Sequence, residues 1–297
     1  MSQILIVGCG YLGRRVARRE REQGNPVVAL VRSAESATGL QACGLEVLRV
    51  DLDDVRSLAG LPTQNAVIYY FAPPPSSGRS DPRISHFLSA IGTDALPARV
   101  VLVSTSGVYG DCHGEWVDES RPARPDADRA HRRFDAETRL RRWAGEYAVP
   151  FVILRVPGIY GPGRLPVERL TRRLPVLREA ESPWSNRVHV DDLVSACLAA
   201  ARHGVTGAVY NISDGHPSTM TDYFNQVADA VGLPRPPQIT LAEARAQLSE
   251  GMRSYLAESK RLDNRRMREE LGVEPQYPDL ARGLAASVAA EGEEASG

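Results

Sequence analysis

The first residues combine a short apolar run with regularly spaced glycines. Residues 4–7 are Ile-Leu-Ile-Val, and the glycines that follow have the spacing G-x-G-x-x-G at Gly8, Gly10 and Gly13. A continuous apolar run is typical of a buried parallel strand, and the helical spacing that follows predicts a helix. In such a unit the first glycine permits a tight turn, the second lets a pyrophosphate approach, and the third lets the helix pack closely. The pattern predicts a dinucleotide-binding turn; the alternative is a tight strand–helix turn without a ligand.

Short apolar segments alternate with helix-like segments through the first half of the chain. This alternation predicts βαβ units in a parallel sheet. A long helix is expected at about 126–147, with Phe134, Leu140 and Trp143 toward the sheet, and another helix from near Asp191. Further strands are expected at residues 26–31, 46–50, 65–71, 99–104, 151–156 and 208–212.

The prediction is an α/β fold, a doubly wound parallel Rossmann sheet with a smaller, carboxyl-terminal and mostly helical substrate lobe. Residues 1–163 would form the NAD(P)-binding Rossmann domain, completed by about 187–212. Residues 164–186 and 213–297 would form the substrate lobe. No internal repeat or low-complexity linker separates the two parts, so they are expected to share a cleft.

Composition and charge narrow the classes of partner. The formal net charge of the 297 residues is −1, with arginines spread among acids, which argues against nucleic acid. No stretch approaches the roughly 18 to 20 apolar residues of a membrane helix, and no signal-peptide pattern precedes the first strand. The four cysteines lack C-x-x-C spacing, which indicates free thiols in a cytoplasmic protein. We expect a small-molecule substrate, no metal, and a monomer or homodimer.

The end of the second strand bears on which dinucleotide would bind. An NAD site usually places an acid there, about 20 residues beyond the glycines, to accept from the ribose 2′-hydroxyl. Here Val31 is followed by Arg32 and Ser33. A guanidinium beside a hydroxyl suits a 2′-phosphate, so NADP is preferred over NAD. The alternative is that Arg32 is an ordinary exposed arginine.

Two further strand ends supply expected cofactor contacts. Asp51 and Leu52 follow the third strand, where the carboxylate of Asp51 would lie near an adenine amino group. Asp51 could equally cap a helix that starts at Asp53. The fourth strand ends in Phe71, Ala72 and Pro73, a rigid turn suited to walling a cofactor cleft.

Several later motifs, together with the glycine turn, resemble those of the NAD-dependent epimerase/dehydratase family, a branch of the extended short-chain dehydrogenases/reductases. The resemblance covers nearly the whole chain, in a shared order. It implies a Rossmann domain that holds NAD(P), a lobe for a substrate that is often a nucleotide-sugar, and hydride chemistry between them. The motifs are Ser-Thr-Ser-Gly-Val-Tyr-Gly at 104–110, Leu-Arg-Val-Pro-Gly-Ile-Tyr-Gly-Pro-Gly at 154–163, Arg-Val-His-Val-Asp-Asp-Leu at 187–193, Tyr-Asn-Ile-Ser-Asp-Gly at 210–215 and Ser-Lys-Arg-Leu-Asp-Asn at 259–264.

The family's usual catalytic group is a Ser or Thr with a Tyr-x-x-x-Lys pair on the next helix. Thr105 matches the Ser/Thr position, but the alignment puts Arg129 at the Tyr position and Arg133 at the Lys position. A guanidinium does not give up its proton, so Arg129 cannot act as a general base. Arg133 could still donate to ribose hydroxyls. Gly158 also stands where the family pattern has Asn. The remaining residues expected to contact the cofactor are Ser104, Val156 and Pro157.

Thr105 and Tyr109 are the candidate catalytic residues. Tyr109 would lie near the nicotinamide, with packing or substrate contact as its alternative role. The candidate substrate residues are Ser106, Tyr160, Arg164, Arg187 and His189. For His189 the alternative is a structural role, with Asp191 or Asp192 as the amino cap of the following helix.

Two functions are consistent with these features. The first is an NADP-preferring epimerase/dehydratase-like or reductase-like enzyme with non-standard catalytic residues, acting on a nucleotide-sugar or another small carbonyl or hydroxyl compound. The second is a catalytically inactive NADP-binding sensor or scaffold protein.

Overall fold

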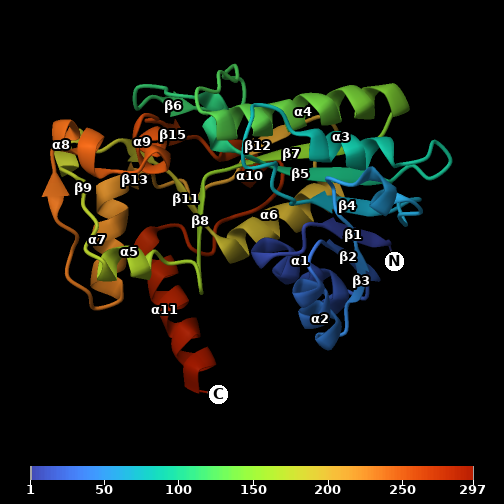
Figure 1. The fold of residues 1–297 in the computed structure, drawn as a ribbon, viewed down its shortest axis with the longest axis horizontal. Coiled ribbons are helices and arrows are strands. Elements are labelled where there is room, and N and C mark those ends of the chain that lie inside the picture. Colours follow the sequence, from blue (N-terminus) through green and yellow to red (C-terminus); the bar gives the residue numbers. More distant parts are fainter. Residues whose placement is uncertain (1, 297) are drawn as a thin grey trace.

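Seven parallel strands form the central sheet, in the order β12-β7-β5-β4-β1-β2-β3 (Figure 1). The computed structural model describes residues 2–296, apart from the side chains at 245, 250 and 293–296. The strand order reverses between β1 and β4, which creates the topological switch point where α/β sheets bind ligands. The predicted doubly wound parallel sheet is confirmed. The strands are β1 (Ile4–Val7), β2 (Val27–Val31), β3 (Glu46–Arg49), β4 (Val67–Tyr70), β5 (Arg99–Thr105), β7 (Phe151–Val156) and β12 (Val209–Asn211).

Alternate residues of each central strand enter two separate cores. In β1, Ile4 and Ile6 pack on the side of α1, α2 and α6, whereas Leu5 and Val7 pack on the side of α3 and α4. Successive side chains of a strand point to opposite faces, so a strand covered on both sides is apolar throughout. These helices are α1 (Tyr11–Glu22), α2 (Ala34–Ala42), α3 (Pro82–Ser89), α4 (Asp128–Tyr147) and α6 (Val190–His203).

The long helix α4 matches its predicted extent to within two residues. Leu140 is fully buried against the sheet, and Trp143 packs at the edge of the same core. Phe134 differs from the prediction, because it packs in a separate cluster with Val108 and Tyr109. These two residues belong to a 3₁₀ helix, η2 (Ser106–Tyr109), that contacts α4.

The carboxyl-terminal lobe is mostly helical, as predicted, and it also contributes to two-stranded sheets. The strand pairs are β10 with β13, β11 with β8, β14 with β9 and β15 with β6. Among the helices of residues 2–296, none combines the length and apolar character needed to cross a membrane. The remaining elements are β6 (Trp116–Val117), β8 (Gly158–Tyr160), α5 (Val167–Thr171), β9 (Val176–Leu177), β10 (Trp184–Ser185), β11 (Arg187–His189), β13 (Ser218–Thr219), α7 (Met220–Ala230), β14 (Gln238–Ile239), α8 (Leu241–Gln247), α9 (Glu250–Leu256), β15 (Arg261–Leu262), α10 (Arg265–Glu269) and α11 (Leu280–Ser296), together with the 3₁₀ helices η1 (Val55–Leu58) and η3 (Glu179–Glu181).

A buried ion pair joins α4 to β5 and β7. The Arg155 guanidinium donates to both carboxylate oxygens of Glu137, at 3.1 and 2.8 Å, and the two side chains are 6% and 1% exposed. The Ser104 hydroxyl donates to the same carboxylate at 2.6 Å. Each group of this network therefore depends on the others to satisfy its charge or hydrogen bonds.

We expect Glu137→Gln to lower the free energy of unfolding by about 3–5 kcal/mol, because it leaves the buried Arg155 charge without its counter-charge. Denaturant unfolding measures the change. Glu168→Gln is the control, since Glu168 pairs with Arg172 at the exposed surface, where a loss below about 1 kcal/mol is expected. Equal losses in the two variants would contradict this account.

Candidate functional site

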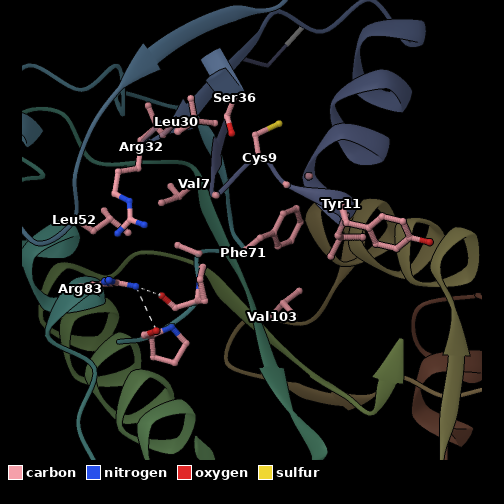
Figure 2. A pocket seen from close by; sticks show the side chains of 18 of the residues that line it. Val7, Cys9, Tyr11, Leu30, Arg32, Ser36, Leu52, Phe71, Arg83 and Val103 are labelled. Carbon is pink, nitrogen blue, oxygen red and sulfur yellow. Dashed lines mark hydrogen bonds between the residues drawn. The ribbon is translucent and has the colours of Figure 1, made fainter. Parts of the chain in front are cut away.

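A cavity of about 930 Å³, here called the switch-point cavity, opens at the carboxyl edge of the sheet between β1 and β4 (Figure 2). Arg164, which was predicted to face substrate, lines this cavity as well. The predicted cofactor residues in its lining are Gly8, Gly10, Tyr11, Leu12, Gly13, Arg32, Ser33, Asp51, Leu52, Phe71, Ala72, Pro73 and Arg133. Lining residues that the sequence did not single out include Cys9, Ser36, Pro74, Ser76, Arg83, Val103 and Ile159.

The glycine turn has the geometry that an anion cradle requires. Gly8 has φ +89°, and a Cβ there would lie 2.6 Å from the Ala72 nitrogen. A Cβ on Gly10 would meet no atom within 4 Å, so the backbone at this position borders open space. A Cβ on Gly13 would lie 3.0 Å from the Gly8 oxygen, and α1 begins without a side-chain cap. A helix amino terminus with free N–H groups beside open space fits a bound pyrophosphate.

Arg32 and Ser33 follow β2 and border the same cavity. The Arg32 side chain points into it (Figure 2) and forms no hydrogen bond or ion pair within the described part of the chain. Ser33 caps α2, because its hydroxyl accepts from the Ser36 nitrogen at 3.1 Å. The Arg32 guanidinium can therefore bind a ligand, whereas the Ser33 hydroxyl is already hydrogen-bonded within the protein.

Asp51 lines the cavity but does not cap a helix. Its carboxylate accepts from the Asp53 nitrogen at 3.0 Å, which forms a local turn. The helical segment here is η1, which begins at Val55 with Asp54 as its cap. The capping alternative therefore belongs to Asp54, and a contact between Asp51 and an adenine stays a prediction.

Two arginines hold the turn that follows β4. Arg83 pairs with Asp53 at 2.6 Å. It also donates to the carbonyls of Pro73 and Pro74 at 3.0 and 3.3 Å (Figure 2). Arg133 donates to the Ala72 carbonyl at 3.0 Å, and burial lowers the pKa of its guanidinium. Arg83 could not be found from local sequence, because its partners lie 9 to 30 residues away.

Three predicted cofactor residues, Ser104, Val156 and Pro157, lie outside the lining of the switch-point cavity. Ser104 is 4% exposed and donates its hydroxyl to Glu137. Val156 is 3% exposed and belongs to the core. Both side chains are engaged within the protein, and the cofactor contacts of Ser104, Val156 and Pro157 stay predictions.

Thr105 and Tyr109, the two candidate catalytic residues, occupy different environments. Thr105 is half-buried at the end of β5, and its hydroxyl caps η2 by accepting from the Gly107 nitrogen at 3.2 Å. Tyr109 is 2% exposed, and its hydroxyl donates to the side-chain amide oxygen of Asn211 at 2.8 Å. Burial raises the pKa of Tyr109 to about 12. A phenol so placed is a poor general base near neutral pH, so the structure favours the packing role over the catalytic one.

Arg129 connects α4 with the segment around α9. Its guanidinium pairs with Glu258 at 2.9 Å, donates to the Ser254 hydroxyl and lies 3.9 Å from the centre of the Tyr255 ring. The other Glu258 oxygen accepts from Lys260 at 2.8 Å, and Lys260 is the one lysine of the chain. We call this arrangement the Arg129 link. In this link the Arg129 guanidinium is held by the largely buried carboxylate of Glu258.

Tyr160 and Arg187, predicted to contact substrate, are both buried in the lobe. Tyr160 is 0% exposed, and its hydroxyl has no hydrogen-bond partner among the described residues. Arg187 is 7% exposed, donates to the Asn186 carbonyl at 2.7 Å and lies 4.1 Å from the Tyr223 ring centre. Burial lowers the pKa of this guanidinium.

The glycine at position 158 makes room for Arg187. The two residues are register partners in β8 and β11, and a Cβ on Gly158 would lie 3.2 Å from the Arg187 Cδ and Nη1 atoms. A larger residue at position 158 would therefore require the Arg187 side chain to shift by a few tenths of an ångström.

His189 has the structural role. It is 1% exposed, and its Nδ1 accepts from the Asp191 nitrogen at 3.2 Å, so His189 itself is the amino cap of α6. This corrects the assignment of the cap to Asp191 or Asp192. Asp192 instead accepts from the Gln276 and Tyr277 nitrogens, at 2.7 and 3.1 Å. Burial lowers the pKa of His189, which favours the neutral imidazole that capping requires.

Ser106 and Arg164 are the remaining candidate substrate residues. Ser106 is half-buried at the start of η2, next to the Thr105 cap. The Arg164 guanidinium lies 4.7 Å from the centre of the Tyr11 ring. Among the side chains that the structure describes, no group of three or more His, Cys, Asp or Glu could hold a metal ion.

Known proteins match this chain along most of its length. The model of the NAD-dependent epimerase/dehydratase family matches residues 4–213. Protein YeeZ of Escherichia coli strain K12 is 28% identical over 291 residues, which cover 94% of this chain and 97% of YeeZ. A functionally unknown conserved protein from Silicibacter pomeroyi has a TM-score of 0.83 at 29% identity, covering 98% of this chain and 100% of that one. The UDP-glucose 4-epimerase of Thermotoga maritima, solved with UDP-glucose, shares the fold, with a TM-score of 0.79 at 20% identity and coverage of 99% and 100%.

Substitution of Tyr109 tests whether its hydrogen bond to Asn211 stabilises the fold. We expect Tyr109→Phe to lower the free energy of unfolding by about 1–3 kcal/mol, because the fully buried Asn211 loses a donor. Thermal or denaturant unfolding measures the loss, with Tyr255→Phe as the exposed control. An unchanged stability would show that the hydrogen bond to Asn211 contributes nothing.

Proposed function

The chain belongs to the NAD-dependent epimerase/dehydratase family, and we propose that it binds NADP(H) and acts on a small carbonyl or hydroxyl compound. The reaction class is epimerase-, dehydratase- or reductase-like. NAD(P) is the cofactor typical of this family, and it supplies hydride transfer when bound. A nucleotide-sugar is one substrate of the proposed class.

The switch-point cavity is the observation that carries this proposal. It joins the glycine turn, the end of β2 and the turn after β4 around one space of about 930 Å³. The uncapped start of α1 would bind the pyrophosphate through N–H groups of Tyr11, Leu12 and Gly13. Arg83 and Arg133 would act indirectly, because they hold the carbonyls of residues 72–74 that wall the cavity.

The preference for NADP rests on Arg32. Its guanidinium points into the cavity and forms no hydrogen bond or ion pair with the described part of the chain, and Val31 stands where an NAD site would have an acid. A 2′-phosphate would accept charge-assisted hydrogen bonds from this group. An NAD ribose would leave the guanidinium unpaired.

The side chains that transfer protons would differ from those typical of the family. Arg129 is bound to Glu258 in the Arg129 link, and Arg133 is bound to Ala72. Thr105 keeps the Ser/Thr position at the end of β5. We propose that Thr105 orients a substrate oxygen, with a proton donor other than Tyr109 or Arg129.

A second candidate function is a sensor or scaffold that binds NADP(H) without turnover. The Arg129 link and the engaged Tyr109 hydroxyl favour it, because both remove the groups that normally transfer protons in this family. Both functions use the same switch-point cavity. They differ in whether bound NADPH is consumed.

Arg32→Glu tests the cofactor preference. We expect NADPH affinity to fall about 10-fold or more, since a charge-assisted hydrogen bond contributes roughly 1.5–3 kcal/mol, and the preference to shift toward NADH. Fluorescence titration with both reduced cofactors measures the ratio of dissociation constants. Arg172→Glu, at the exposed residue that follows α5, is the control and should leave this ratio unchanged. If Arg32→Glu also leaves it unchanged, the argument for NADP is removed.

Thr105→Ala distinguishes the two candidate functions. Purified protein with bound NADPH is screened against carbonyl compounds and nucleotide-sugars for loss of the reduced-nicotinamide absorbance. For the enzyme we expect turnover that falls in Thr105→Ala while NADPH affinity is kept. NADPH binding without turnover of any of these compounds would favour the sensor or scaffold.

A further inference from the structure

A second cavity, of about 920 Å³, lies along α1 and shares no lining residue with the switch-point cavity. We call it the α1 cavity. Residues 8–13 line the first cavity, whereas Arg14, Arg15, Arg18 and Arg21 line the second. The two spaces are therefore separate, although the same helix borders both.

The α1 cavity concentrates positive charge in a chain whose formal net charge is −1. Four guanidinium groups face two carboxylates, those of Glu22 and Asp191. Glu22 is already engaged by Arg19, which lies outside the cavity lining, at 3.2 Å. The nearest approach of Glu22 to the lining arginines is 3.8 Å, to Arg18.

Arg14 and Arg15 form no ion pair with any side chain that the structure describes. Arg15 donates to the Tyr11 carbonyl at 3.2 Å, which is a neutral acceptor. Arg14 and Arg18 are four residues apart on the helix, a spacing at which like charges repel. An anion in the cavity would relieve this repulsion.

The walls between the arginines are largely apolar. Leu40, Leu45, Pro162 and Ala290 contribute from α2, the segment before β3, the loop after β8 and α11. A volume of this size lies in the range of small-molecule sites, roughly 300–1,000 Å³. Several guanidinium forks around apolar walls suit a ligand with a polyphosphate group and an organic part.

We propose that the α1 cavity is a second binding site, for a small organic molecule that carries a di- or polyphosphate. This site is distinct from that of the proposed cofactor. The Arg15 guanidinium lies 4.1 Å from the centre of the Tyr11 ring, and Tyr11 lines the switch-point cavity. The two sites thus meet at the first turn of α1.

The test uses ADP as the probe and isothermal titration calorimetry, with and without saturating NADPH. We expect wild-type protein to bind ADP at a site that NADPH does not block. Arg14→Ala/Arg18→Ala should weaken ADP binding at least tenfold and leave NADPH affinity unchanged. Arg172→Ala/Arg282→Ala removes two exposed arginines elsewhere and is the matched control. Thermal unfolding checks that all variants are folded.

Three results would overturn the proposal. They are no ADP binding, ADP binding that NADPH displaces completely, and ADP binding that is equal in wild type and Arg14→Ala/Arg18→Ala. If polyglutamate binds this face and ADP does not, the first of these results applies and the ligand is an acidic peptide. If NADPH does not bind, the proposed cofactor is wrong. The second site would still be supported if ADP binding is lost in Arg14→Ala/Arg18→Ala and kept in Arg32→Glu.

Discussion

The backbone of the first turn passes in close contact with the backbone after β4, and the switch-point cavity is built on this approach. Gly8 and Ala72 come so near that a side chain at position 8 would meet main-chain atoms. The approach fixes two walls of the cavity relative to each other. Arg83 and Arg133 stabilise the second wall by binding carbonyls that have no strand partner.

The binding half and the catalytic half of this family's site depend on different physical features. Binding of a dinucleotide uses backbone N–H groups, turns and one or two cations, which follow from the fold. Proton transfer depends on single side chains with shifted pKa values. In this structure Arg129 and Tyr109 are engaged by Glu258 and Asn211, whereas the backbone of the glycine turn borders open space.

Features set by neighbouring residues could be predicted from the sequence, and those set by distant residues could not. The strand at 4–7 and the glycine turn are defined by a few consecutive residues, and both have the expected form. The Arg129 link joins residues 129 and 258, which no local pattern connects. The capping role of His189 was missed because Asp191 and Asp192 are more usual caps, and only the structure shows which atom faces the free N–H group.

The Arg129 link also restricts which side chains position 129 can accept. A neutral side chain there would leave the carboxylate of Glu258, which is 8% exposed, with Lys260 as its remaining cation. Removal of one partner of a largely buried ion pair destabilises the region that contains it. Positions 129 and 258 are therefore coupled, so a substitution at one of them would need a compensating change at the other.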